Sequence, residues 1–312
     1  MEKFTALFLY WRYPQSGITI MDSSSTIILG IALFIIMIGM GLALTIADFK
    51  RVLQMPKAVL IGFLNQIILL PLIAYVLGLI FGVEPAIAIG IMILAACPGG
   101  PTSNLVTHLA KGDIALSVTL TAVNSLITII SIPLIVSFAL DAFLGETAAV
   151  EAPIGNIIGS LVVIIAIPLM IGMLVKRYAE SFADRMERSV RIASGVLITL
   201  VIVGLVIKER AHIIEYFESA LFITLALNII TMLVGYFSAK LAKLNFKQAL
   251  TIAIESGNQN GTLAISLAVV SLARPDFAIA AAVYSIMMYA TASVAVYLGN
   301  KATKEAFGEA TA

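Results

Sequence analysis

Glu255 is the one acidic side chain that lies inside a membrane-length apolar segment of this chain. The local sequence, residues 254–261, is IESGNQNG, and apolar helix-forming residues flank it on both sides. A charged side chain at bilayer depth costs at least about 2.5 kcal/mol, and a polar run with glycines exposes backbone groups that lipid cannot satisfy. Both features are tolerated together where they line a site filled with water or ions. The segment therefore indicates a transport site.

A second interruption, CPGGPTSN at residues 97–104, lies inside an apolar run from 86 to 110. Proline removes a backbone donor and glycine destabilises a helix, so this run is expected to end one half-helix. Ser103 and Asn104 are favourable N-caps, and the next half-helix is expected to start near Leu105. Each break leaves carbonyls free at one half-helix end, which suit a cation, and amides free at the other, which suit an anion.

The oxygen ligands near these breaks favour sodium as the cation, with a proton as the alternative. One carboxylate, side-chain amides, hydroxyls and backbone carbonyls are hard ligands, and one carboxylate is too little charge for a calcium or magnesium cage. Ser117 and Thr121, one helical turn apart, and Asn124 add oxygens from one segment, and Gln66 adds another. Such hydroxyls also often bond to their own helix, and a lone glutamine often only joins two helices.

The elements that must position these residues are membrane helices. The chain is 61% hydrophobic and 12% charged, against roughly 45–50% and about 25% in soluble domains. With a mean hydropathy of +1.07, it is expected to be an all-α polytopic membrane protein. Nine segments that lack charge, apart from Glu255, are predicted to span the membrane: 24–47, 58–82, 86–110, 114–140, 153–175, 192–207, 219–239, 248–273 and 277–300.

Charge orients the nine spans. With the N-terminus outside, fourteen Lys and Arg residues fall on the inner side and five on the outer side, which satisfies the positive-inside rule. The prediction is a multi-pass protein of the plasma (inner) membrane, surrounded by lipid, with an N-terminal arm at 1–23 and a cytoplasmic tail at 301–312. The net charge of +1 gives no indication of a nucleic-acid partner, and none is expected.

The two breaks occupy matching positions in two inverted halves. Spans one to four, residues 24–140, can be superposed in order on spans six to nine, which run in the opposite direction. The second half also includes the fifth span and covers residues 153–300. The third member of each set is the one that breaks. Paired interrupted helices in inverted repeats are the best sequence indication of a transporter's binding site. A single transporter domain is therefore predicted over 24–312.

At these residues the chain resembles the bile acid:sodium symporter family. The resemblance rests on Pro98-Gly99-Gly100-x-x-Ser103-Asn104 and Glu255-x-Gly257-x-Gln259-Asn260. It implies a bacterial-type member that lacks the first of the ten spans of many bacterial relatives. It also implies two crossing broken helices in a core domain, and a panel domain that moves relative to it in alternating access. The implied activity is sodium-coupled uptake of an organic anion, either bile-acid-like or a small carboxylate such as pyruvate or pantoate.

The resemblance also implies ligands for two sodium ions. One ion would bind Ser103, Asn104, Ser117, Thr121 and Glu255. The other would bind Gln66, Glu255 and Gln259, with the backbone carbonyls of Ser256 and Asn258. Thr102, Asn260 and Tyr289 are the expected contacts of the organic anion.

Two other functions compete with symport. A proton-coupled organic-anion carrier or a sodium/proton antiporter would also use crossed broken helices, although no Lys or Arg lies within a predicted span. A receptor or structural membrane protein would not need two matched breaks. An enzyme is not expected, because no nucleophile–base pair is visible.

Overall fold

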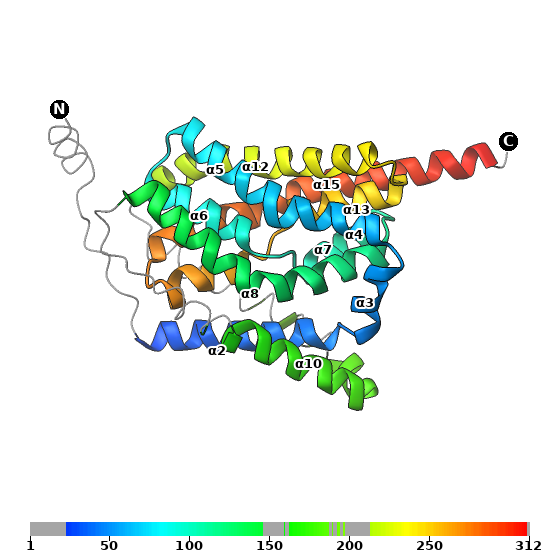
Figure 1. Ribbon diagram of the computed structural model, residues 1–312, viewed down its shortest axis with the longest axis horizontal. Coiled ribbons are helices and arrows are strands. Elements are labelled where there is room, and N and C mark those ends of the chain that lie inside the picture. Colours follow the sequence, from blue (N-terminus) through cyan, green and yellow to red (C-terminus); the bar gives the residue numbers. More distant parts are fainter. Residues whose placement is uncertain are drawn as a thin grey trace.

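The structure is a computed structural model that describes residues 23–145, 162–186 and 213–310, with the single positions 159, 189, 192, 193 and 196. The regular elements in these ranges are all helices, and no strand occurs among them (Figure 1). The predicted all-α class agrees with this. The predicted N-terminal arm at 1–23 lies outside the described residues, except for Ser23.

Several of the helices are long and apolar enough to cross a membrane. Four such stretches occur in the described ranges: Pro56–Phe81, Ile114–Leu144, Ala220–Leu241 and Pro275–Glu305. A fifth results if Pro85–Ala96 and Pro101–Leu109, which meet at 70°, form one broken span. The predicted segment 192–207 and the start of 153–175 lie largely outside the described residues. The count of nine spans therefore stays a prediction.

The first predicted span ends earlier than expected. It was placed at 24–47, whereas α2 covers Ser23–Leu42 and a new short helix, α3 (Ile46–Lys50), follows it. The reason is a capping interaction, in which the backbone N–H and the hydroxyl of Thr45 donate to the Asp48 carboxylate at 2.6 and 2.7 Å. The Thr-x-x-Asp pattern starts α3 and so ends the apolar span.

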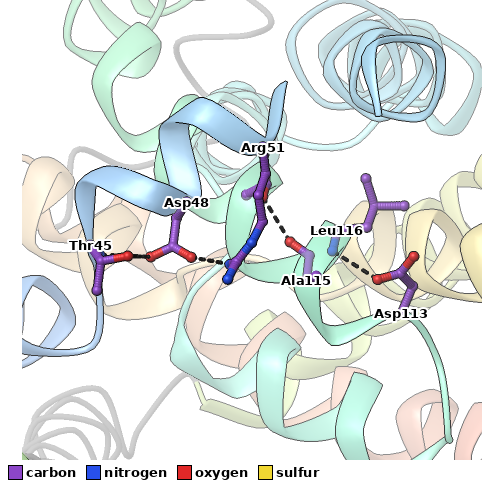
Figure 2. Close-up of polar contacts among 7 residues, drawn as sticks. Thr45, Asp48, Arg51, Asp113, Ala115 and Leu116 are labelled. Carbon is purple, nitrogen blue, oxygen red and sulfur yellow. Dashed lines mark hydrogen bonds and ion pairs between the residues drawn. The ribbon is translucent and has the colours of Figure 1, made fainter. Parts of the chain in front are cut away.

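The α3 segment forms an elbow against the beginning of α8 (Ile114–Leu144). Asp48 is buried and pairs with Arg51, the first residue of the 3₁₀ turn η1 (Arg51–Leu53). Figure 2 shows these side chains beside Asp113, the N-cap of α8, whose carboxylate accepts from the Leu116 N–H at 3.0 Å. Both α3 and η1 contact α8. The elbow thus connects α2 to the rest of the molecule.

Helices α2 and α10 (Ile167–Tyr178) form a pair at one side of the molecule, along the lower edge of Figure 1. The π-helical turn η4 (Val162–Ala166) leads into α10. The two helices approach closely at Gly41 and Gly172. A Cβ built on Gly41 would lie 3.0 Å from the Gly172 Cα and would also meet the Leu169 carbonyl oxygen. Two glycines without side chains therefore set the spacing of this pair.

The rest of the described chain packs around α6 (Pro85–Ala96), in which all ten residues from 87 to 96 are buried. Helix α6 contacts α8, α5 (Leu70–Phe81) and α15 (Ala278–Ala310). Helix α5 continues α4 (Pro56–Leu64) through the π-helical turn η2 (Asn65–Leu69). Helix α12 (Ile213–Leu241) packs against α13 and α15. The predicted tail at 301–312 continues α15 as a helix to Ala310.

The second broken element is built from α13 (Phe246–Gly257), α14 (Gly261–Ser266) and the π-helical turn η5 (Leu267–Ser271). Every residue from 249 to 269 is buried. The 3₁₀ turn η6 (Pro275–Phe277) then leads into α15. A polar break is thereby held in the interior, away from lipid.

Candidate functional site

The structure brings the two breaks into contact. Residues 97–100 separate α6 from α7 (Pro101–Leu109), and residues 258–260 separate α13 from α14. The Asn260 N–H donates to the Pro98 carbonyl oxygen at 2.9 Å, which joins one break to the other. Two segments about 160 residues apart in sequence therefore form one site.

The start of α7 differs from the prediction. The helix begins at Pro101, with Gly100 as its N-cap, and not near Leu105. Proline is favoured at the first helical position because the N–H it lacks has no helical partner there and its φ is already suitable. Ser103 therefore lies inside the first turn, where its Oγ donates to the Gly100 carbonyl at 2.7 Å, and Asn104 follows it.

The Glu255 carboxylate lies in a cluster of oxygen atoms from three helices. Its Oε1 accepts from the Ser117 hydroxyl, and its Oε2 lies 3.3 Å from the Thr121 hydroxyl. Asn104 Oδ1 lies 2.7 Å from the Ser117 Oγ and 3.3 Å from the Thr121 Oγ1. Only 2% of Glu255 is exposed. We call Asn104, Ser117, Thr121 and Glu255 the Glu255 cluster.

With the Asn104 amide oxygen facing the two hydroxyls, the Glu255 cluster has fewer protons than acceptor contacts. Each hydroxyl carries one proton, so Ser117 and Thr121 supply two protons to four contacts with carboxylate and amide oxygens. Among the described residues, none of the recorded ion pairs involves Glu255. A buried negative charge with surplus lone pairs needs a positive partner. The geometry fits a small cation bound by oxygens.

Gln66 and Gln259 form a second polar group beside the Glu255 cluster. Gln66 lies in the π-helical turn η2, and its Nε2 donates to Gln259 Oε1 at 2.7 Å. If the Gln66 side-chain amide is turned so that its oxygen and nitrogen exchange places, its oxygen lies 3.2 Å from the Gly99 backbone nitrogen. The Gln66 amide nitrogen then lies 3.2 Å from the Glu255 carbonyl oxygen. The Gln259 Nε2 donates to the Ser256 carbonyl at 2.9 Å. Gln66 therefore contacts both breaks, whereas its neighbour Asn65 turns to Ser238.

Gly99 separates the two groups and is closely surrounded by oxygens. A Cβ on Gly99 would lie 2.7 Å from Glu255 Oε2, 3.2 Å from Ser103 Oγ and 3.4 Å from the Asn258 carbonyl oxygen. Ser103 and Asn258 thus lie next to Glu255. The structure brings all nine predicted cation ligands to the crossing: Gln66, Ser103, Asn104, Ser117, Thr121, Glu255, Ser256, Asn258 and Gln259.

The predicted anion contacts are less closely grouped. The Asn260 side chain is buried and caps α14 by accepting from the Leu263 N–H at 3.0 Å. Thr102 is partly exposed in the first turn of α7. Tyr289, on α15, is half exposed, and no recorded hydrogen bond of the described residues joins it to the crossing. The structure therefore places Asn260 at the crossing, whereas it shows no hydrogen bond between the described residues that would bring the Tyr289 side chain there.

Sequence reasoning missed two buried side chains that contact the second break. Asn228 of α12 and Tyr284 of α15 both bond to the Gly257 carbonyl oxygen. An asparagine in the middle of an apolar segment was a visible signal, whereas Tyr284 resembles any aromatic residue of a membrane helix. Asn124, which the sequence does indicate, is buried on α8, and neither atom of its amide has a partner among the described residues.

Comparison with known proteins identifies the family. A family model described as the sodium bile acid symporter family matches residues 30–216, more than half of the chain. The chain belongs to this family. The match covers the first break and ends before Glu255.

Three relatives extend the match over both breaks. The uncharacterized sodium-dependent transporter YocS of Bacillus subtilis is 32% identical over 303 residues, which cover 96% of this chain and 90% of the relative. The ileal sodium/bile acid cotransporter of Oryctolagus cuniculus is 30% identical, over 92% of this chain and 82% of its own length. The probable sodium/metabolite cotransporter BASS2, chloroplastic, of Oryza sativa subsp. japonica is 28% identical, over 96% of this chain and 72% of its own length.

The symporter family is one of sodium-dependent transporters, and the relatives named above all carry the names of transporters. Together with the apolar helices, this makes the chain a multi-pass membrane protein with a role in transport, and it points away from an enzyme.

Proposed function

We propose that this protein is a sodium-coupled symporter that imports an organic anion by alternating access. The single observation that carries the proposal is the proton shortage of the Glu255 cluster, in which two hydroxyl protons face four acceptor contacts around a buried carboxylate. Sodium binds oxygen ligands of this kind without requiring a second carboxylate.

Two sodium positions are proposed at the crossing. The first takes Ser103, Asn104, Ser117, Thr121 and Glu255. The second takes Gln66, Gln259 and Glu255 with the carbonyls of Ser256 and Asn258. The Asn258 carbonyl has no recorded hydrogen bond among the described residues and lies beside Gly99, which supports its role as a ligand. Glu255 would serve both ions, so one carboxylate offsets part of both charges.

The proposed cargo is an organic anion, either bile-acid-like or a small carboxylate. The N-terminal end of α7, which begins at Pro101 beside the crossing, suits a negative charge because its first amides lack helical partners. Thr102 and Asn260 are the proposed anion contacts nearest to it, and Tyr289 is proposed to contact a larger cargo from α15. The names of the relatives, which mention bile acids and metabolites, support both kinds of anion.

Movement is proposed between the α2–α10 pair, as part of the panel, and a core that contains the two breaks. The Gly41–Gly172 contact unites α2 with α10, and the α3 elbow joins α2 to α8 of the core. The third predicted element of each inverted half carries the break, in α6–α7 and in α13–α14. This matched placement supports an inverted repeat with nine spans, and the excess of Lys and Arg on the inner side supports an N-terminus outside and a C-terminus in the cytoplasm.

Two sodium ions provide enough free energy for accumulation. A potential of about 100 mV is worth about 2.3 kcal/mol for each charge, and a tenfold gradient adds about 1.4 kcal/mol for each ion. Two ions then supply about 7.4 kcal/mol, and import of a monovalent anion costs about 2.3 kcal/mol. The remaining 5 kcal/mol, roughly, would support accumulation of several thousandfold.

Current measurements on reconstituted protein test the proposed function. Taurocholate and pyruvate are applied to proteoliposomes in sodium and in potassium, with and without a pH gradient. Symport predicts a current that requires sodium and one of the anions together, with one net positive charge for each anion. Uptake driven by a pH gradient in potassium, or sodium–proton exchange without an anion, would instead support the competing carrier or antiporter.

A further inference from the structure

The last turn of α13 has four carbonyl groups without helical partners, and their hydrogen bonds fall into two classes. The Ile254 carbonyl accepts from Asn258, and the Glu255 and Ser256 carbonyls accept from the Gln259 side chain at 3.3 and 2.9 Å. Residues of the break itself thus cap three of the four. The Gly257 carbonyl is the exception, because its partners come from two other helices.

Asn228 and Tyr284 close a triangle on the Gly257 carbonyl oxygen. Asn228 Nδ2 donates to this oxygen at 2.7 Å, and the Tyr284 hydroxyl donates to it at 2.8 Å. Asn228 Nδ2 also lies 3.0 Å from the Tyr284 hydroxyl oxygen. Both side chains are fully buried. We call these three groups the Gly257 triangle.

Each of the three contacts of the Gly257 triangle has its own proton, in contrast to the contacts of the Glu255 cluster, although the Asn228 Oδ1 has no partner among the described residues. The Asn228 amide supplies two protons and the tyrosine hydroxyl one, and three contacts use them. Both lone pairs of the Gly257 carbonyl oxygen are therefore engaged by donors. This carbonyl cannot bind a cation while the triangle is closed.

The triangle fixes the peptide plane that leads into the break. The Gly257 carbonyl and the Asn258 N–H belong to one planar peptide unit. The oxygen of this unit accepts from the two side chains of the triangle, and the Asn258 N–H of the same unit donates to the Ile254 carbonyl oxygen at 2.9 Å. With that plane fixed at both ends, the φ of −108° and ψ of 96° of Asn258 set where its own carbonyl points.

We propose that Asn228 and Tyr284 are positioning residues for the second sodium ion. Neither side chain touches the ion or the anion. They hold the Gly257 carbonyl out of the coordination sphere and aim the neighbouring Asn258 carbonyl at the ion. The inference rests on the proposed function, since it assumes that this carbonyl binds sodium. Partners that orient the ligands of a metal typically alter its affinity 10–100-fold when they are removed.

The test is a sodium titration of the thermal stability of the full-length purified protein, at constant ionic strength with potassium as the replacement. Tyr284→Phe keeps the buried ring and removes one donor. Tyr297→Phe is the matched control, because Tyr297 lies on the same helix and is 66% exposed. Asn228→Leu, which keeps the number of side-chain heavy atoms and the branching at Cγ, removes the other two protons. Lithium replaces sodium in a second titration.

We expect Tyr284→Phe to raise the half-saturating sodium concentration about tenfold and to change the ratio of the sodium and lithium constants. Tyr297→Phe should keep the native values. A merely structural role would lower the melting temperature equally in all salts and leave both half-saturation constants unchanged.

Each result decides between the two proposals. A native protein without any sodium response overturns the proposed function and this inference with it. A native response with unchanged constants in both Tyr284→Phe and Asn228→Leu overturns the inference alone. Failure of both variants to fold also counts against it, because a positioning role requires a folded protein with an altered ion response.

Discussion

Glu255 and the hydroxyl groups around it differ from an ordinary buried polar network. Buried polar groups in proteins are nearly always matched donor to acceptor. The Glu255 cluster breaks this rule in one direction only, with acceptors in excess. A surplus of lone pairs at one point selects a cation, and it makes the site sensitive to the loss of any single oxygen.

Thr121→Val is expected to weaken sodium binding about tenfold and to leave stability in potassium nearly unchanged. Both hydrogen bonds of the Thr121 hydroxyl are long, at 3.3 Å, so their loss should cost less than about 1 kcal/mol without sodium. Thr119→Val is the matched control, because Thr119 is equally buried and its hydroxyl bonds to the Ala115 carbonyl of its own helix. Equal sodium titrations of the two variants would contradict the ligand role of Thr121.

Gly99→Ala is expected to abolish the sodium response of a protein that still folds. The added Cβ would lie 2.7 Å from Glu255 Oε2, so the carboxylate must move out of the cluster. Gly100→Ala is the control, since its Cβ would meet nothing closer than the Asn260 side chain at 3.9 Å and its φ of −129° suits alanine. Sodium titrations of melting temperature compare them, and an intact response in Gly99→Ala would refute the proposed geometry.

The sequence identified the candidate ligands better than it identified what supports them. Glu255, Gln259 and the Pro-Gly-Gly run are conspicuous because polar residues and helix breakers are costly in an apolar segment. The Gln66–Gln259 contact joins residues 193 positions apart, and the contacts of the Gly257 triangle join residues 27–56 positions apart. No local sequence pattern reveals contacts of this kind. Ser103 was wrongly expected to cap α7, because Pro101 starts that helix first.

Helix boundaries depend on capping residues as much as on hydropathy. The apolar pattern predicted a first span that continues to residue 47, but Thr45 and Asp48 begin a new helix and α2 ends at Leu42. Span 58–82 corresponds closely to Pro56–Phe81, where Pro56 and Gly82 mark the two ends. The π-helical turn that orients Gln66 within this span has no signal in the sequence.

Gly41→Ala is expected to destabilise the α2–α10 pair by about 1–3 kcal/mol, because the Cβ would strike the backbone of α10. The melting temperature should fall by several degrees, equally in sodium and potassium, since neither α2 nor α10 carries a proposed sodium ligand. Gly30→Ala on the same helix is the control, because nothing lies within 4 Å of its added Cβ. A loss as large in Gly30→Ala would contradict a specific role for the close contact.

The predicted orientation of the whole molecule rests on its charge distribution and can be tested on intact cells. Asp141→Cys is expected to react with a membrane-impermeant maleimide from outside, whereas Lys240→Cys is expected to react only after the cells are opened. Both positions are exposed, and the native Cys97 is fully buried, so the background should be low. The reverse labelling pattern would overturn the predicted orientation.

The central claim is that the oxygen cluster around Glu255 binds sodium. The most direct measurement is the melting temperature of the purified protein in sodium and in potassium, for the native chain and for Glu255→Gln. A ligand that binds only the folded state raises stability with the logarithm of its concentration above its dissociation constant. We predict such a rise for the native protein in sodium alone, and identical melting in both salts for a folded Glu255→Gln. Equal melting of the native protein in the two salts, or an undiminished sodium response in Glu255→Gln, would contradict the claim.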